Sequence, residues 1–253
     1  MNPTRFFECE NGRRIAYHRT GPKSGTETRP GLVFCGGYKS DMTGTKAVFL
    51  ENWAHEQGLP FLRFDYSGHG ESSGLFEDGS IGEWAEDARA AFDALTEGPQ
   101  IVIGSSMGGW IALLLARGGA GRIAGLLGIA AAPDFTEDGF WAGFSDEQRE
   151  AIMRFGRIQL PSEYEDSPYI VTRKLIEDGR EHLVLRTPLN LPFPVRLLQG
   201  SEDGSVDQSV PLRLMNHAEC DDLRLNFVKG EDHSFSTPRA LEILANTLRE
   251  MIA

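Results

Sequence analysis

Short apolar segments of β type alternate with segments of helical spacing through most of this 253-residue chain. The apolar runs begin at Leu32, Phe61, Ile101, Leu126, Val195 and Leu223. Such short runs are typical of strands that are buried on both faces of a sheet. Apolar residues recur at helical spacing over residues 46–57, 81–95, 110–117, 210–217 and 238–252. The alternation predicts an α/β fold: a mostly parallel sheet with right-handed crossovers, flanked by helices.

Two more β-type segments precede the first buried run, at residues 5–9 and 13–19. The dipeptide Asn11-Gly12 separates them, and this pair favours the tight turn of a β-hairpin. We therefore expect an antiparallel hairpin at one edge of the sheet, which brings the sheet to eight strands.

The stretch between Pro133 and Pro192 breaks the alternation. It is aromatic, charged and punctuated by prolines, and Ser145 followed by acidic residues is typical of a helix start. It is too long for a plain loop and too short for a domain of its own. The sequence predicts one domain over residues 1–253, with a short helical insertion at residues 134–191 as a candidate lid above the carboxyl edge of the sheet.

Two adjacent serines stand where the run from Ile101 ends, in I-V-I-G-S-S-M-G-G-W. In a Gly-x-Ser-x-Gly pattern the serine lies on a sharp turn between a strand and a helix, because the flanking glycines remove Cβ clashes. Ser106 has these glycines at Gly104 and Gly108, whereas Ser105 lacks them. Ser106 is therefore the candidate nucleophile, at a helix start that favours developing negative charge.

A serine hydroxyl needs a neighbouring base, and the base needs a group that orients it. With the nucleophile on such a turn, the chain order is serine, acid, histidine. His233 alone among the six histidines follows a late predicted strand in a polar loop before the last helix. Asp203 is the preferred acid, Asp207 and Asp134 stay open as alternatives, and Asp203 and Asp207 also fit a turn or helix-cap role.

Hydrolysis through a serine also needs donors for the oxyanion of the tetrahedral intermediate. The N–H group of Met107, directly after the nucleophile, fits one donor position. The second donor is expected in the loop F-C-G-G-Y-K-S, from the N–H of Tyr38 or Gly37, since glycines let the backbone approach a substrate oxygen.

Composition excludes several other classes of protein. The net charge is −12 and no block of Lys or Arg stands out, which disfavours a nucleic-acid partner. Cys9, Cys35 and Cys220 are odd in number and far apart, so we expect free thiols rather than disulfides or a zinc site. A glycine-rich turn explains Asp65 and His69 better than a metal site. We expect no metal and no cofactor.

The longest uncharged apolar stretch, residues 123–133, is about half the roughly 20 residues that a membrane span needs. The first ten residues resemble neither a signal peptide nor an organelle transit peptide. We therefore expect a cytoplasmic protein, a monomer or homodimer, without a membrane span.

Several segments of the chain are similar to α/β-hydrolases. They are G-Y-K-S-D-M-T-G-T-K-A from Gly37, R-F-D-Y-S-G-H-G from Arg63, G-P-Q-I-V-I-G-S-S-M-G-G-W from Gly98, P-S-E-Y from Pro161, V-R-L-L-Q-G from Val195 and D-H from Asp232. More narrowly, they resemble the family of the mitochondrial palmitoyl-protein thioesterase that also acts as a mycophenolic acid acyl-glucuronide esterase.

This resemblance implies an α/β-hydrolase fold, with Ser106 as nucleophile, Asp203 as acid and His233 as base. It also implies that both thioesters and activated oxygen esters are substrates. The chain departs from the family pattern at Gln199, where a histidine often precedes the glycine, and at Cys35-Gly36, where a proline is more usual.

The predicted function is a serine hydrolase that cleaves a small-molecule ester or an acylated protein. Phe140, Trp141, Phe144 and Phe155 in the insertion form either an acyl pocket or the core of the insertion itself. The alternatives are a small-molecule carboxylesterase, a carbon-carbon bond hydrolase with the same triad, and a hydrolase-fold module that binds without catalysis.

Overall fold

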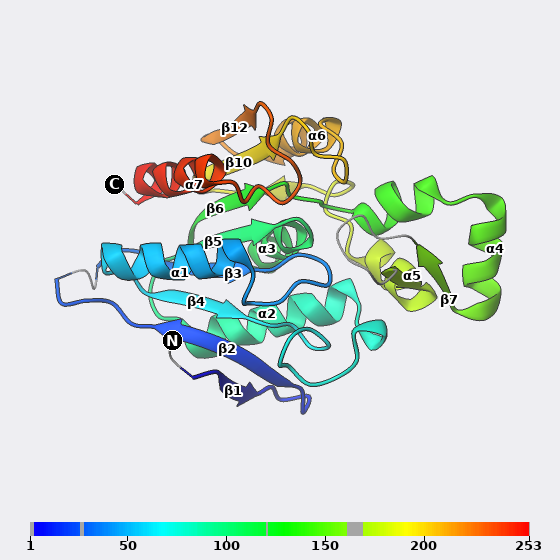
Figure 1. The fold of residues 1–253 in the computed structure, drawn as a ribbon, viewed down its shortest axis with the longest axis horizontal. Coiled ribbons are helices and arrows are strands. Elements are labelled where there is room, and N and C mark those ends of the chain that lie inside the picture. Colours follow the sequence, from blue (N-terminus) through cyan, green and yellow to red (C-terminus); the bar gives the residue numbers. More distant parts are fainter. Residues whose placement is uncertain (1–2, 26–27, 120, 161–168, 253) are drawn as a thin grey trace.

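A mixed sheet of eight strands forms the centre of the molecule in the computed structural model, which describes residues 3–25, 28–119, 121–160 and 169–252 (Figure 1). The strands are β1 (Arg5–Glu8), β2 (Arg14–Thr20), β3 (Gly31–Cys35), β4 (Phe61–Phe64), β5 (Gln100–Ser105), β6 (Ile123–Ile129), β10 (Val195–Gly200) and β12 (Leu223–Val228). Their order across the sheet is β1-β2-β4-β3-β5-β6-β10-β12. This confirms the predicted sheet.

Within this eight-stranded sheet, β2 runs against the other strands. β2 is antiparallel to both β1 and β4, and the remaining neighbours pair in parallel. The registers align Leu32 with Ile101 and Ser105 with Ile129. Parallel strands end at the same edge of a sheet, so the loops after β3, β5, β10 and β12 gather on one side of the molecule.

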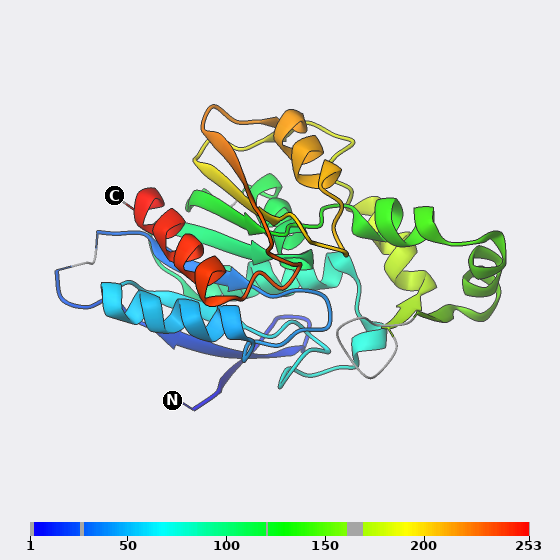
Figure 2. The same ribbon diagram turned by 45° about the horizontal axis from the view of Figure 1, so that its top comes forward.

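Helices cover both faces of the sheet. On one face lie α1 (Thr45–Gln57) and α7 (Pro238–Met251), which run side by side (Figure 2). On the other lie α2 (Ile81–Leu95), α3 (Met107–Arg117) and α6 (Ser209–His217). Successive strand residues contribute to opposite layers, as the period of a strand requires: Leu32 packs under α1, and Val33 packs under α2 and α3.

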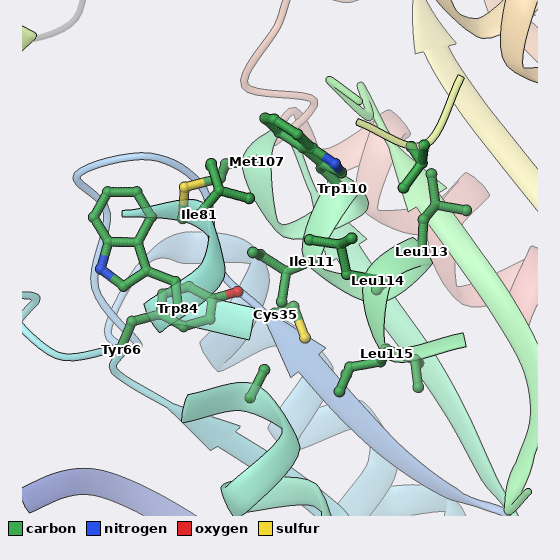
Figure 3. Packing of buried hydrophobic residues seen from close by; sticks show 14 of the residues in the cluster. Cys35, Tyr66, Ile81, Trp84, Met107, Trp110, Ile111, Leu113, Leu114 and Leu115 are labelled. Atoms are coloured by element: carbon green, nitrogen blue, oxygen red, sulfur yellow. The ribbon is translucent and has the colours of Figure 1, made fainter. Parts of the chain in front are cut away.

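The layer under α2 and α3 contains the largest buried side chains (Figure 3). Trp84 and Trp110 are almost completely buried there, and Tyr66 lies beside Cys35. Each indole N–H has an acceptor: Trp84 donates to the carbonyl of Ser67, and Trp110 donates to the carbonyl of His182. A buried indole N–H usually finds a hydrogen-bond partner in this way.

The insertion after β6 extends beyond the carboxyl edge of the sheet (Figures 1 and 2). It contains a π-helical segment η2 (Thr136–Trp141), α4 (Asp146–Phe155), β7 (Arg157–Leu160), β8 (Tyr169–Thr172) and α5 (Arg173–Glu181). The predicted helix start is correct, because Ser145 and Gln148 form a capping box at α4. The P-S-E-Y segment from Pro161 lies outside the described residues.

The sequence analysis expected a helical insertion, but the insertion also contains two strands. β7 and β8 pair in antiparallel fashion, with Ile158 opposite Val171. β7 (R-I-Q-L) alternates polar with apolar residues, and β8 (Y-I-V-T) consists of aromatic and β-branched residues, so both compositions suit a strand. A short 3-10 helix, η1 (Phe76–Asp78), and a two-residue parallel pair, β9 (Leu189–Asn190) with β11 (Ala218–Glu219), complete the elements.

Buried polar contacts fix the end of the insertion that is nearest the sheet. The carboxylate of Asp134, without exposed surface, accepts hydrogen bonds from the N–H groups of Val184 (2.8 Å) and Leu185 (3.1 Å) and pairs with Arg186 (2.5 Å). Asp178 on α5 accepts from the N–H of Gly82 at the start of α2 (2.7 Å). The segments that leave and re-enter the main domain are therefore tied together.

We expect Asp134→Ala to lower the free energy of unfolding by about 2–4 kcal/mol, because two buried N–H groups lose their acceptor and Arg186, which keeps Asp138, loses one of its two carboxylate partners. Urea denaturation measures the change. Asp207→Ala is the matched control: Asp207 is exposed and accepts from the N–H of Ser209 in the first turn of α6 (2.8 Å), so its loss should change the free energy of unfolding much less. Equal losses for the two variants would contradict a buried anchoring role for Asp134.

Candidate functional site

Ser106 lies on a strained turn between β5 and α3. Its backbone has φ 54° and ψ −119°, a conformation that costs a residue with a side chain of order 1–3 kcal/mol. Backbone hydrogen bonds hold the turn: the N–H of Ser106 donates to Ile129 (2.9 Å), and its carbonyl accepts from Gly109 (2.9 Å) and Ala132 (3.0 Å). The strained residue is thus fixed by the neighbouring strand β6 and the loop after it.

The two glycines of the pattern are required by close backbone packing. A Cβ atom on Gly104 would lie 2.3 Å from the carbonyl oxygen of Gly108, and a Cβ on Gly108 would lie 2.1 Å from the carbonyl oxygen of Cys35. Distances this short are not tolerated between a side chain and rigid backbone. The turn can therefore form only with glycine at both positions.

Three side chains from three separate loops form one hydrogen-bonded line. His233 Nε2 lies 3.0 Å from Ser106 Oγ, and His233 Nδ1 lies 2.9 Å from Asp203 Oδ2. Asp203 follows β10 and His233 follows β12, so parallel neighbouring strands bring them together. With Nδ1 protonated towards the carboxylate, Nε2 is the nitrogen that faces the serine hydroxyl as an acceptor.

The carboxylate of Asp203 is buried yet well supplied with donors. Its Oδ1 accepts from the N–H groups of Ser205 (2.9 Å) and Val206 (2.8 Å). Burial alone would raise the pKa of Asp203. The hydrogen bond and charge of His233, with those backbone N–H groups, outweigh it and hold the pKa below its ordinary value. Asp203 therefore stays ionised next to the histidine.

Gln199 is a contact of this site whose role the sequence analysis did not assign. Its amide Nε2 donates to Asp203 Oδ2 (2.8 Å) and to the carbonyl of Val206 (3.3 Å), and the residue is completely buried. It thus fixes the same carboxylate oxygen that His233 contacts. Its place before Gly200, in the position where related sequences often have histidine, was the available signal.

The two alternative acids have other partners. Asp134 anchors the return of the insertion, and Asp207 accepts from the N–H of Ser209 near the start of α6. Asp203 is the acid whose carboxylate lies 2.9 Å from His233 Nδ1. The geometry therefore favours the first of the three acids that the sequence left open.

The expected oxyanion donors surround the serine. Met107 is the first residue of α3, and an N–H in the first turn of a helix has no acceptor within that helix. Gly37 lies against Ser106: a Cβ atom built on Gly37 would be 3.5 Å from the Cβ of Ser106. Gly37 and Tyr38 both line the cavity above the serine, and the side chain of Met107 is buried beneath it.

Asp65 and His69 occupy a closed polar turn instead of a second reactive centre. Asp65 accepts from the N–H groups of Met42 (2.6 Å) and Glu71 (2.9 Å). His69 is buried between aromatic rings, and burial lowers its pKa to about 4, so it is neutral near pH 7. Across the described ranges, no group of three or more His, Cys, Asp or Glu side chains is placed to hold a metal ion.

A cavity of about 560 Å³ opens above Ser106 and His233. Of the four aromatic residues expected to wall an acyl pocket, Phe140 lines it. Phe144 is buried in the core of the insertion. The guanidinium carbon of Arg180 lies over the ring of Trp141, 4.5 Å from its centroid. Phe155 on α4 is 69% exposed. The insertion thus uses its aromatic residues both for a pocket and for its own packing. The ring of Phe155 serves neither purpose, because it lies on the surface.

Other apolar residues of the insertion that the sequence analysis did not select also line the cavity: Phe135, Leu160 and Tyr169. Tyr38 connects them to the main domain. Its ring meets those of Phe135 (5.6 Å), Phe140 (5.9 Å) and Tyr169 (5.8 Å), and its hydroxyl donates to the carbonyl of Ile170 (3.2 Å). The loop expected to hold the oxyanion is therefore packed directly against the insertion.

The three cysteines are free thiols. Cys35 adjoins the oxyanion loop, but complete burial raises the pKa of its thiol to about 12, so it is not available as a thiolate nucleophile. In the part of the chain that the structure describes, no helix is long and apolar enough to cross a membrane.

The comparisons with known proteins agree with this geometry. A family model described as "Alpha/beta hydrolase family" matches residues 32–242. The chain is 34% identical over 239 residues to a protein from Rattus norvegicus named "Palmitoyl-protein thioesterase ABHD10, mitochondrial", covering 94% of this chain and 78% of the relative. That name places the relative in mitochondria, while a cytoplasmic location of this chain stays a prediction.

Solved structures show the same similarity. A crystal structure of a protein from Agrobacterium vitis S4 superposes with a TM-score of 0.93 at 38% identity and covers 100% of both chains. Alpha/beta hydrolase domain-containing protein 10 from mouse superposes with a TM-score of 0.90 at 31% identity, covering 99% of this chain and 98% of the other. Fold, sequence and structural relatives together show that this chain is a hydrolase that belongs to the alpha/beta hydrolase family.

Proposed function

We propose that this protein hydrolyses acyl thioesters and activated oxygen esters by transfer of the acyl group to Ser106 and then to water. The observation that carries the proposal is the hydrogen-bonded line of Asp203, His233 and Ser106 at the floor of a cavity. A nucleophile, a base and a group that orients the base are the components that acyl transfer through serine requires.

The reaction follows from the positions of these groups. His233 Nε2 accepts the proton of Ser106 Oγ as that oxygen attacks the substrate carbonyl. The Asp203 carboxylate holds Nδ1–H and stabilises the imidazolium that forms. The N–H groups of Met107 and of Gly37 or Tyr38 stabilise the oxyanion. The imidazolium then protonates the departing alcohol or thiol, and water repeats the sequence on the acyl-enzyme.

The cavity suits an acyl group with apolar surface. Its volume of about 560 Å³ lies within the range of sites that enclose small ligands. Rings from the insertion form one wall, and the strained serine lies at the start of α3. The relatives named palmitoyl-protein thioesterases support a thioester as one of the substrates. An acylated protein and a small-molecule ester are both consistent with this cavity as substrates.

Ser106→Ala should abolish ester hydrolysis, because it removes the hydroxyl that lies 3.0 Å from His233 Nε2 and donates its proton to that nitrogen. Ser105→Ala should retain most activity and is the matched control. The measurement is the turnover of p-nitrophenyl esters from acetyl to palmitoyl and of the matching acyl thioesters. Full activity of the Ser106 variant, or failure of Ser106 to react with a fluorophosphonate, would instead indicate a module that binds without catalysis.

We expect Asp203→Asn to lower kcat by about a thousandfold to ten-thousandfold, because an amide favours the wrong histidine tautomer. Asp207→Asn should stay near wild type, and kcat with p-nitrophenyl acetate separates the two. A small effect at Asp203 together with a large one at Asp207 would reverse the assignment of the acid.

The same carboxylate makes stability depend on pH. Because the folded pKa of Asp203 lies below its ordinary value, which is about 3.9, its contribution to the free energy of unfolding is fully present above that pH. The contribution is lost as the pH falls through the folded pKa. Acid denaturation should therefore destabilise the wild type more steeply than Asp203→Asn, and a parallel decline of the two would contradict the lowered pKa.

Phe140→Ala should weaken the use of long acyl chains more than that of acetyl, because it removes apolar surface from the cavity wall. We expect kcat/KM with a decanoyl ester to fall about tenfold or more relative to acetate. Phe155→Ala is the control of equal chemistry at an exposed position. A chain-length profile that Phe140→Ala leaves unchanged would place the acyl group elsewhere.

A further inference from the structure

The loop that presents the base His233 is strained two residues further along the chain. Phe235 has φ 46°, in the left-handed region that bulky residues rarely adopt. Its ring has no exposed surface and packs in the layer under α1 and α7. Because such strain persists only where neighbouring groups fix the backbone, the contacts between His233 and Phe235 determine where the base stands.

The peptide unit that joins Ser234 to Phe235 is bonded at both of its polar ends. The N–H of Phe235 donates to Asp232 Oδ1 (3.2 Å). The carbonyl of Ser234 accepts from the hydroxyl of Ser236 (2.8 Å) and from the ammonium group of Lys46. These contacts fix the plane of a peptide that directly follows the base.

Lys46 differs from the other partners of this peptide because it comes from a separate element. Asp232 and Ser236 belong to the loop itself, whereas Lys46 is the second residue of α1 and lies 188 positions away from Ser234. The start of α1 and the loop before α7 lie at the same end of these two helices (Figure 2). The buried side chain of Leu50 anchors α1 to the sheet. The ammonium group therefore ties the loop of the base to the helical layer.

This lysine is a charged donor at pH 7. Burial lowers the pKa of Lys46 to about 8, and the charge of Asp232 offsets part of that effect. An ionised donor makes a shorter and stronger hydrogen bond than a neutral one. A lysine is seldom buried to this degree, because removing its charge from water is costly. A strong contact with the Ser234 carbonyl accounts for its position better than packing alone.

We propose that Lys46 is a positioning residue for the base. Its ammonium group holds the Ser234 carbonyl, and this contact keeps the ring of His233 in line. The ring has to satisfy two contacts at once, with Ser106 Oγ at 3.0 Å and with Asp203 Oδ2 at 2.9 Å. A displacement of about 1 Å can cost roughly a hundredfold in rate. The inference rests on the proposed acyl transfer through Ser106 and adds to it a residue that acts through His233.

Lys46→Met should lower kcat by about tenfold to a hundredfold and leave KM close to its wild-type value. Formation and hydrolysis of the acyl-enzyme use the same base, so both half-reactions slow down together. With the neutral substrates 4-nitrophenyl acetate and 4-nitrophenyl decanoate, kcat should fall by the same factor. Lys229→Met removes the same charge from an exposed position after β12 and should retain wild-type kcat. A raised KM with unchanged kcat, or a loss confined to one ester, would mean that Lys46 contacts the substrate instead.

Chemical restoration of the amine separates a positioning role from a loss of folding. Lys46→Cys, treated with 2-bromoethylamine, gains a side chain with the charge and nearly the length of lysine, and mass spectrometry verifies the product. We expect the product to regain most of the kcat that Lys46→Cys loses. Wild type treated in the same way is the control, because Cys220 is partly exposed. A modified variant that stays as slow as Lys46→Cys would contradict the inference.

A double-mutant cycle tests whether the lysine acts through the base. Asp203→Asn already disturbs the histidine, so Lys46→Met should lower kcat by a smaller factor in that background than in the wild type. If the two effects multiply in full, the lysine acts independently of His233 and the inference is wrong.

The low-field NMR resonance of the proton between His233 Nδ1 and Asp203 gives a readout that needs no turnover. We expect Lys46→Met to shift or broaden this resonance and Lys229→Met to leave it unchanged. An unchanged resonance in Lys46→Met refutes the positioning role. Ser106→Ala is measured in parallel: turnover without the serine refutes the proposed function, whereas serine-dependent turnover that Lys46→Met leaves unchanged refutes only the role of Lys46.

Discussion

The site depends on one strained residue that the sheet holds in place. Ser106 has a positive φ because its hydroxyl must stand above the end of β5 while the chain turns directly into α3. The strain persists because Gly104 and Gly108 let the two segments touch and because the backbone of Ser106 is bonded to β6 and to the loop after it. Such strain is stable only where the surrounding fold over-determines it.

The remaining groups reach the serine because parallel strands end at one edge. His233 is separated from Ser106 by 127 positions and from Asp203 by 30, yet all three lie in loops at that edge. The donors around Asp203, including the buried amide of Gln199, keep the carboxylate ionised and aimed at the histidine. A charged acid can remain buried there only because each of its oxygens has donors.

Above this edge, the cavity has two chemically different sides. Tyr38 packs with the rings of the insertion and donates a hydrogen bond to it, so the loop that contains Gly37 and Tyr38 forms one unit with the apolar wall. Near the His233 loop, the wall is polar and contains Lys46. The apolar wall thus comes from the insertion, while the polar side carries the base.

The sequence by itself predicted the fold, the elbow serine and the order of the three candidate residues, because short buried strands, flanking glycines and loop positions are local patterns. It left Asp134, Asp203 and Asp207 open, assigned no role to Gln199, missed β7 and β8, and did not separate the aromatic residues of the insertion by role. The tertiary structure bears on these points: it places Asp203 2.9 Å from His233 and separates the aromatic side chains by position. The direction of a side chain depends on packing between segments far apart in the chain: Phe140 faces the cavity while Phe155 faces solvent, although the same stretch of sequence supplies both.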